Sequence, residues 1–240
     1  MVGKKWLKLI KSLHQKKYRN EHGLFFVEGK KVVHELLHAN IELVKILVQP
    51  EFVEVFPELE VDTIAPQELK FISALKNPNG ILGVFKIPAP SEITNTDWIV
   101  ALDDVRDPGN LGAIIRLCDW FGVRNLVCSE STVDLFNPKV VQATMGSLGR
   151  VNVIYTPLQE FLQKTELPIY GTFMNGNPVY TEELPHAGVL VMGNEANGIS
   201  QEVKELATNR ISIPQYGEPT TESLNVAMAT GILLNEIRRG

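Results

Sequence analysis

One loop-like segment, residues 103–112, combines carboxylates, a Pro-Gly pair, Asn110 and Gly112. It follows an apolar run and opens a stretch with helical periodicity. The Pro-Gly pair predicts a turn, and Asn110 suits the N-cap of the helix that follows. Gly112, in the first turn, leaves backbone amides open to an anion or to a neighbouring chain. The segment is therefore a candidate ligand-binding loop.

Arg116 is the only charged residue within the apolar stretch 111–118. A guanidinium keeps its charge, so burying it without a partner is costly. Arg116 is compatible with an ion pair to Asp119 or Glu195. It is equally compatible with a role in phosphate binding or catalysis.

A second segment, Gly193-Asn194-Glu195-Ala196-Asn197-Gly198, directly follows the apolar run 189–192. Two glycines five residues apart, with a carboxylate between them, predict a tight loop that can approach a ligand closely. The glycine spacing fits neither the dinucleotide fingerprint nor the P-loop. A plain strand-to-helix turn remains the alternative.

A third segment joins the expected strand 211–213, which ends at Pro214, to a helix that begins near Ser223. Asn225 adds a second acceptor at this end of the helix, where free amides favour acceptors. Simple capping explains Ser223 but not Asn225. The helix also has a thin side that could pack closely on another helix or subunit, formed by Ala227, Ala229 and Gly231.

Around these segments, apolar periodicity predicts two α/β domains. Residues 1–90 form a small α/β unit, and 88–91 is a stiff boundary rich in proline. Residues 95–240 alternate apolar strands with helices, which predicts a parallel sheet covered on both faces. Ligands bind such sheets beyond the carboxyl ends of the strands, where the three segments fall. The expected helices are 4–19, 30–38, 67–75, 111–121, 139–148, 158–164, 201–207 and 222–239, and the expected strands are 24–27, 44–48, 81–87, 98–102, 125–128, 151–155, 169–174, 189–192 and 211–213.

Composition excludes several classes of protein. The chain has 240 residues, a net charge of −5 and two cysteines, so neither a disulfide framework nor a cysteine-rich zinc site is expected. His34 and His38 have metal-ligand spacing, but no further ligand pattern supports them, so no metal is predicted. No apolar run is long enough for a membrane span or a signal peptide. A cytoplasmic protein is therefore expected.

The charge is unevenly distributed. Residues 1–31 contain nine basic and two acidic groups, a net of +7, so the remainder carries −12. Phosphate binding needs only a local positive surface, and this basic arm is a candidate contact for nucleic-acid phosphates. A solvated lysine face is the alternative. The candidate nucleic-acid-binding residues are Lys4, Lys8, Lys11 and Arg19.

Taken together, the three segments resemble the SpoU branch of the SPOUT RNA 2′-O-ribose methyltransferases. The resemblance covers nearly the whole chain, and three motifs in this order are strongly specific. Residues 23–30, Gly-Leu-Phe-Phe-Val-Glu-Gly-Lys, resemble the start of the family's L30e-like substrate-binding domain. The motifs are Asn110-x-Gly112-x-x-x-Arg116, Val191-Met192-Gly193-Asn194-Glu195-x-x-Gly198, and Ile213-Pro214 with Ser223-Leu224-Asn225-Val226.

The resemblance implies an L30e-like domain at 1–90 and a methyltransferase domain at 95–240 with a deep trefoil knot. It also implies S-adenosylmethionine bound in the knot and a homodimer formed through the C-terminal domain. The expected cofactor contacts are Thr172, Gly193, Ile213 and Leu224. The rim at 215–221 departs from the family pattern, since a methionine is usual where Gln215 stands.

The resemblance further assigns Arg116 to proton removal from the ribose hydroxyl. An arginine normally keeps its proton, so binding RNA phosphate and orienting the nucleophile suits it better. The expected positioning residues are Asn110, Glu195, Ser223 and Asn225.

Ribosomal RNA is the preferred substrate and transfer RNA the lesser one. The competing functions are a non-catalytic RNA-binding protein with a relict SPOUT domain and a nicotinamide-dependent oxidoreductase. The missing Gly-x-Gly-x-x-Gly motif disfavours the oxidoreductase.

Overall fold

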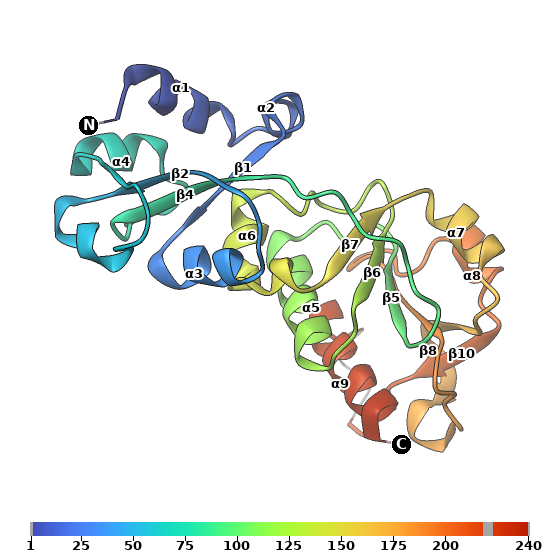
Figure 1. Ribbon diagram of the computed structural model, residues 1–240. Coiled ribbons are helices and arrows are strands. Elements are labelled where there is room, and N and C mark those ends of the chain that lie inside the picture. The colour runs from blue at the N-terminus through green and yellow to red at the C-terminus, as the bar shows by residue number, and fades with distance from the viewer. Residues whose placement is uncertain (1, 218–222, 240) are drawn as a thin grey trace. The chain divides into compact units, whose positions relative to one another are not determined.

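A computed structural model describes residues 2–217 and 223–239 (Figure 1). The chain divides into two compact units. The first contains residues 1–89 and 134–149, and the second contains 90–133 and 150–240. The chain therefore leaves the second unit after Val133 and returns to it at Arg150, whereas the sequence pattern predicts a single boundary near residue 90.

The first unit is built on a four-stranded sheet in the order β1-β4-β2-β3. β4 pairs antiparallel with β1 and β2, and β3 pairs parallel with β2. The strands are β1 (Leu24–Glu28), β2 (Leu43–Val48), β3 (Asp62–Thr63) and β4 (Ile81–Lys86). The helices are α1 (Lys4–Ser12), α2 (Lys16–His22), α3 (Lys30–His38), η1 (Pro50–Val55), α4 (Pro66–Ile72), α6 (Pro138–Thr144) and η2 (Ser147–Gly149).

Alternation along β1 separates the two faces of this sheet. Phe26 points to the core that α1 and α4 share with Leu82 and Val84. Phe25 points to the other face, where its ring lies near Phe85, with centroids 6.0 Å apart. α3 lies on that side, opposite α1 and α4 (Figure 1).

Residues 134–149 complete the first unit. α6 lies against β1, which is an edge strand, and the ring of Phe136 is 4.6 Å from that of Phe25. Gly149 lies so close to α3 that an added Cβ would meet the Cβ of Ala39 at 2.6 Å. These contacts explain why the segment belongs to the first unit despite its place in the sequence.

The expected helix 4–19 is interrupted after Ser12, and α2 begins at Lys16. Arg19 on α2 is only 3% exposed. Its guanidinium donates to the Leu13 carbonyl (2.7 Å) and to Asp134 (2.5 Å). The prediction that Arg19 contacts RNA is therefore wrong: the residue is a buried structural cation that helps hold the 134–149 segment.

The second unit contains a six-stranded parallel sheet in the order β10-β8-β9-β5-β6-β7. This confirms the predicted α/β class. The strands are β5 (Ile99–Leu102), β6 (Asn125–Cys128), β7 (Asn152–Tyr155), β8 (Ile169–Pro178), β9 (Val189–Met192) and β10 (Asn209–Ser212). The helices are α5 (Pro108–Trp120), α7 (Leu158–Lys164), η3 (Val179–Thr181), α8 (Gln201–Lys204) and α9 (Val226–Arg239).

Helices cover both faces of this sheet. Ile99, Ala101 and Val191 share a core with α7 and α8, so the alternate side chains face the other layer. In that layer α5 and α9 lie side by side (Figure 1), and the approach is close because Gly231 faces Leu117. Among the described residues, no helix is both long and apolar enough to cross a membrane.

Candidate active site

The carboxyl ends of β5 and β9 are neighbours in the parallel sheet, so the loops that follow them meet. The loop after β5 leads into α5, whose first helical residue is Pro108. Asp107 is the N-cap of α5, because its carboxylate accepts a hydrogen bond from the backbone of Asn110 at 2.9 Å. The expectation that Asn110 caps this helix is therefore wrong, and its side chain is free for other contacts.

Asn110 connects residues from all three sequence segments. Its side-chain amide nitrogen donates to Oε1 of Glu195 at 2.9 Å, and its oxygen accepts from Asn225 at 2.9 Å. These residues lie up to 115 positions apart in the chain. The structure thus brings Asn110, Glu195 and Asn225 into one hydrogen-bonded chain, as the sequence analysis expects of a site.

Both ends of this hydrogen-bonded chain are anchored at helix N-termini. The Glu195 carboxylate lies 3.4–3.5 Å from the backbone amides of Arg106 and Asp107, at the start of α5, where the helix dipole favours an anion. The side-chain oxygen of Asn225 accepts from the amides of Ala227 and Met228 and so caps α9. The expectation that capping does not explain Asn225 is therefore wrong, although its amide nitrogen also donates to Asn110. The side-chain orientations are consequently fixed by backbone.

The loop after β9 needs glycine at its start to keep this conformation without a steric clash. A Cβ on Gly193 would lie 2.3 Å from the carbonyl carbon of Gly198, which itself has a φ of +67°. Asn194 and Gly198 exchange two backbone hydrogen bonds of 2.9 Å across the loop. The side-chain oxygen of Asn194 also accepts from the amides of residues 196 and 197. The backbone of this loop is therefore closely packed and preorganised.

Carboxylates after β5 hold this loop in place. Asp103, 7% exposed, accepts from the Ser200 amide at 2.7 Å. The Asn194 side chain donates to the carbonyl oxygen of Asp104 at 2.7 Å. Asp104 also pairs with the exposed Arg106, and this hydrogen bond raises the pKa of that guanidinium. Asp103 and Asp104 belong to the candidate loop 103–112, but their sequence pattern did not predict that they hold the loop after β9.

The expected cofactor residues have different surroundings. The Thr172 hydroxyl donates to the carbonyl of Val191 at 3.0 Å, linking β8 to β9. Ile213 is half-buried just beyond β10, while Ser223 and Leu224 are exposed before α9, Leu224 by 51%. The divergent rim at 215–221 lies partly outside the described residues, which omit 218–222.

Arg116 does not join the cluster. It is exposed on α5, and among the residues that the structure describes no hydrogen bond or ion pair to its guanidinium is present. Neither expected partner binds it, because Asp119 pairs with Arg150 and Glu195 with Asn110. Arg116 lies one helical turn before Trp120, which is 84% exposed.

Trp120 borders an open groove of about 630 Å³ between α5 and α9. Two other exposed apolar residues line this groove, Met228 (69% exposed) and Tyr180 (40%). Such a concentration of exposed apolar area is typical of an interaction surface. The groove lies entirely within the second unit.

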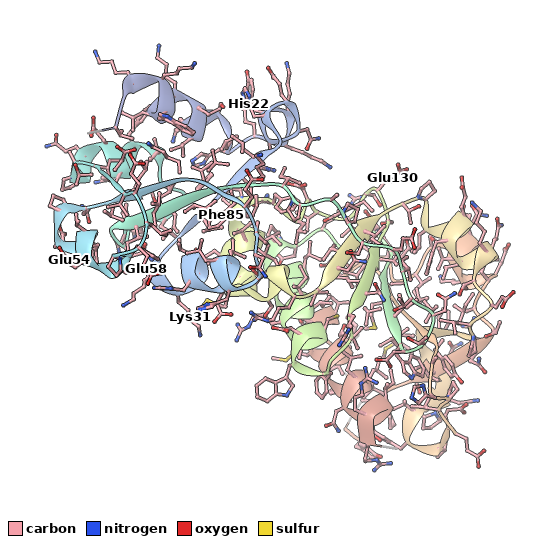
Figure 2. The ribbon with its side chains drawn as sticks, viewed as in Figure 1. His22, Lys31, Glu54, Glu58, Phe85 and Glu130 are labelled. Carbon is pink, nitrogen blue, oxygen red and sulfur yellow. The ribbon has the colours of Figure 1, made fainter. Side chains whose placement is uncertain are left out.

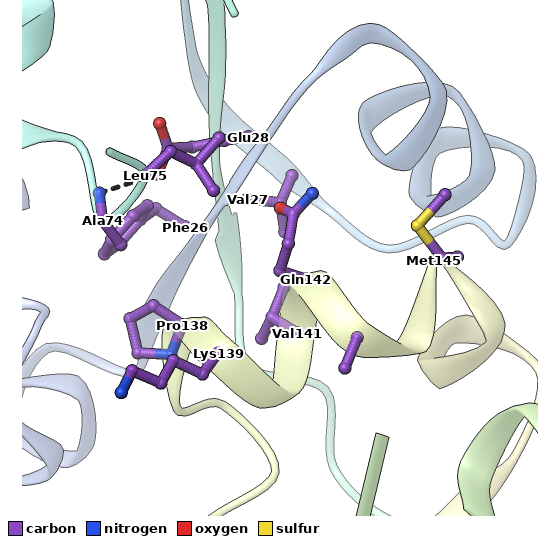
Figure 3. Close-up of a pocket in the computed structure, with 11 residues that line it drawn as sticks. Phe26, Val27, Glu28, Ala74, Leu75, Pro138, Lys139, Val141, Gln142 and Met145 are labelled. Atoms are coloured by element: carbon purple, nitrogen blue, oxygen red, sulfur yellow. Dashed lines mark hydrogen bonds between the residues drawn. The ribbon is translucent and has the colours of Figure 1, made fainter. Parts of the chain in front are cut away.

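A cavity of about 320 Å³ in the first unit lies between α6 and the turn after α4 (Figure 3). Glu28, 4% exposed, lines it. Both carboxylate oxygens are occupied by hydrogen bonds, one from the Ser73 hydroxyl at 2.5 Å and one from the Ala74 amide at 2.8 Å. Glu28 therefore anchors the turn that follows α4.

Comparison with known families assigns both parts of the chain. Residues 97–235 match the SpoU rRNA Methylase family, and residues 4–83 match the MRM3-like substrate binding domain. The protein belongs to the SpoU rRNA methylase family and has an N-terminal substrate-binding domain of the MRM3-like type. The predicted family and the predicted α/β architecture are confirmed.

Individual relatives align with this chain over almost its full length. The 23S rRNA (guanosine(2553)-2′-O)-methyltransferase RlmP of Bacillus subtilis is 29% identical over 95% of this chain and 94% of its own. A TrmH-family RNA methyltransferase structure from Porphyromonas gingivalis, described as putative, aligns with a TM-score of 0.89 and 35% identity, covering 100% and 99% of the two chains. An AdoMet-bound rRNA methyltransferase from Sinorhizobium meliloti aligns with a TM-score of 0.88 and 31% identity, covering 100% and 96%.

Proposed function

We propose that this protein transfers the methyl group of S-adenosylmethionine to a ribose 2′-hydroxyl of ribosomal RNA. The observation that carries the proposal is the hydrogen-bonded chain Asn110–Glu195–Asn225, which joins all three motifs at the carboxyl edge of the parallel sheet. Full-length relatives named as rRNA methyltransferases support this substrate over transfer RNA. The trefoil knot that the resemblance implies remains a prediction.

The residues at this edge fit an S-adenosylmethionine molecule. The loop that starts at Gly193 offers backbone polar groups and leaves no space for a side chain at its first position. Leu224 exposes an apolar side chain that a purine could cover, and Ile213 lies beside the end of β10. The bound cofactor would supply a methyl group on a positively charged sulfur. We assign Gly193, Ile213, Leu224 and Thr172 to its binding.

The protein side chains orient the reactants. Asn110 is fixed by Glu195 and Asn225, so it can hold a ribose or phosphate oxygen in one position, and Ser223 lies exposed two residues before Asn225. The exposed guanidinium of Arg116 binds an RNA phosphate and holds the 2′-hydroxyl for in-line attack. The hydroxyl releases its proton to solvent as its oxygen takes the methyl group. On the N-terminal helix, the exposed Lys4, Lys8 and Lys11 add phosphate contacts.

We further propose that the groove between α5 and α9 is covered by a second copy of this chain. The exposed indole of Trp120 and the Met228 side chain supply apolar area, and the thin side of α9 permits close approach. Arg116 then lies at the edge of the subunit interface, one turn from Trp120. A cytoplasmic location follows from ribosomal RNA as substrate.

Methyl transfer from tritiated S-adenosylmethionine to ribosomal RNA tests the function. Arg116→Ala is expected to lose at least about tenfold in turnover, since one charge-assisted contact is worth about 1.5–3 kcal/mol. Cofactor binding, measured by calorimetry, should persist. Arg124→Ala is the matched control, because Arg124 is an exposed arginine of the same unit outside the cluster.

Near-normal turnover of Arg116→Ala would contradict the role of Arg116. A wild-type protein that binds ribosomal RNA without cofactor binding or methyl transfer would instead support the relict RNA-binding alternative. Trp120→Glu should convert a dimer to monomers in sedimentation experiments. A monomeric wild-type protein would refute the proposed interface.

A further inference from the structure

Phe71 on α4 exposes an aromatic ring that the core of the first unit does not require. Its neighbours Leu69 and Ile72 are 1% and 0% exposed and fill the core, whereas Phe71 is 55% exposed. Among the described residues before the 88–91 boundary, no other large apolar side chain is exposed to this degree. Burial in the folded monomer therefore does not explain a phenylalanine at this position.

The backbone next to Phe71 is held by three contacts from distant parts of the chain. Nε2 of His14 lies 2.6 Å from the carbonyl oxygen of Ile72, and as the hydrogen-bond donor it carries the proton. The Glu28 carboxylate accepts from the Ser73 hydroxyl and the Ala74 amide; Figure 3 shows the second bond. The ring is thus presented from a fixed backbone, so little conformational entropy is lost when something stacks on it.

The ring lies beside the basic face of α1. Lys11 Nζ lies over the face of the ring, 5.3 Å from its centroid, in a cation–π contact. Lys8 and Lys4 precede Lys11 at helical spacing on the same face of α1. Within the part of the chain that the structure describes, none of these three lysines forms an ion pair, and all three are exposed. Lys70, next to Phe71 on α4, is exposed too. An aromatic face among uncompensated cations is complementary to a nucleobase between two phosphates.

We propose that Phe71 is a stacking platform for an unpaired base of RNA, with Lys11 and Lys8 on the flanking phosphates. The inference rests on the proposed function, because the RNA in question is the substrate of methyl transfer. It adds that the substrate has a single-stranded segment where it contacts Phe71. A duplex keeps its bases stacked on one another, so it could use the lysines but not the ring. Base–aromatic stacking tolerates any sequence.

Binding of the full-length protein to two fluorescein-labelled probes tests the proposal without S-adenosylmethionine. The probes are a 12-nucleotide oligouridylate and an RNA duplex of the same length. Phe71→Leu should weaken binding to the single strand by about 5- to 150-fold, the equivalent of 1–3 kcal/mol per stacked base. Binding to the duplex should change by less than about twofold, and the salt dependence should stay the same since no charge is removed.

Two further variants separate stacking from charge. Phe71→Trp should retain affinity for the single strand, and the added indole should be quenched by oligouridylate. Lys11→Gln should lower the slope of log affinity against log salt by about 0.7 on the single strand. Lys31→Gln is the matched control for charge, because it removes one charge from the same arm 1–31, but from an exposed lysine on α3, across the sheet from α1 (Figure 2).

The proposal would be overturned if Phe71→Leu lowered the affinity for both probes equally, or if it left the affinity for the single strand unchanged. If Phe71→Leu fails to fold, absence of indole quenching in Phe71→Trp has the same consequence. Failure of the proposed function gives a different result. The wild-type protein would then transfer no methyl group, while the effect of Phe71→Leu on the affinity for each probe could still be measured.

Discussion

Replacing either partner of the buried pair Arg19–Asp134 should lower the stability of the first unit, but by unequal amounts. The two side chains are 2.5 Å apart, but Arg19 is 3% exposed and Asp134 is 17% exposed. Asp134→Asn leaves a guanidinium that water cannot reach, at a cost of about 3–5 kcal/mol. Arg19→Met leaves a carboxylate that can partly hydrate, at about 1–3 kcal/mol. Replacing both by Met and Leu should restore most of the stability.

Hydrogen–deuterium exchange of β1 and β4 amides in the full chain measures these free energies for the first unit alone. Lys86→Met is the matched control, because Lys86 and Glu42 form an exposed pair in the same unit, expected to contribute less than about 1 kcal/mol. The reasoning fails if Arg19→Met costs more than Asp134→Asn, or if neither exceeds the control. Because Arg19 is buried, Arg19→Met should also leave the salt slope of RNA binding unchanged.

Three other outcomes follow from the second unit. Gly193→Ala should abolish cofactor binding in calorimetry and destabilise the fold by about 1–3 kcal/mol, because its Cβ has no space against the facing backbone, whereas Gly3→Ala in the first unit, with open space around it, should do neither. Burial raises the pKa of the Cys118 thiol to about 12, so iodoacetamide at pH 8 should alkylate it only after unfolding. The hydrogen bond from Arg238 lowers the pKa of Asp97, so this pair stabilises above about pH 4 and is lost as pH falls through the lowered value. Asp97→Asn should flatten the acid limb of thermal stability by less than about 1 kcal/mol, since both side chains are about one-third exposed.

Sequence periodicity predicted the second unit well because its strands are apolar and buried on both faces. Val189–Met192 was predicted with its observed bounds. The meeting of Asn110, Glu195 and Asn225 was predictable in outline, since loops at the carboxyl ends of neighbouring parallel strands converge. The partners themselves depend on which side chain caps which helix. Asp107 was the better-placed cap for α5, and this left the Asn110 side chain available.

The first unit was harder to predict because its completing helix comes from elsewhere in the chain. Local periodicity identifies α6 as a helix but contains no information about which sheet covers its apolar face. The same limit applies to Arg19, which sequence alone places on a basic helix. Only the position of Asp134, 115 residues later, shows that the guanidinium is buried.

The return of residues 134–149 to the first unit has a consequence for protein synthesis. When a ribosome has made the first ninety or so residues, the edge of β1 has no α6 to cover it, and Arg19 has no carboxylate to neutralise it. Folding that begins at the N-terminus cannot be completed until translation has passed residue 149, by which time β5 and β6 have also emerged. The substrate-binding domain therefore stays incomplete on the ribosome until residues 134–149 have been synthesised, and these residues are inserted within the sequence of the catalytic domain.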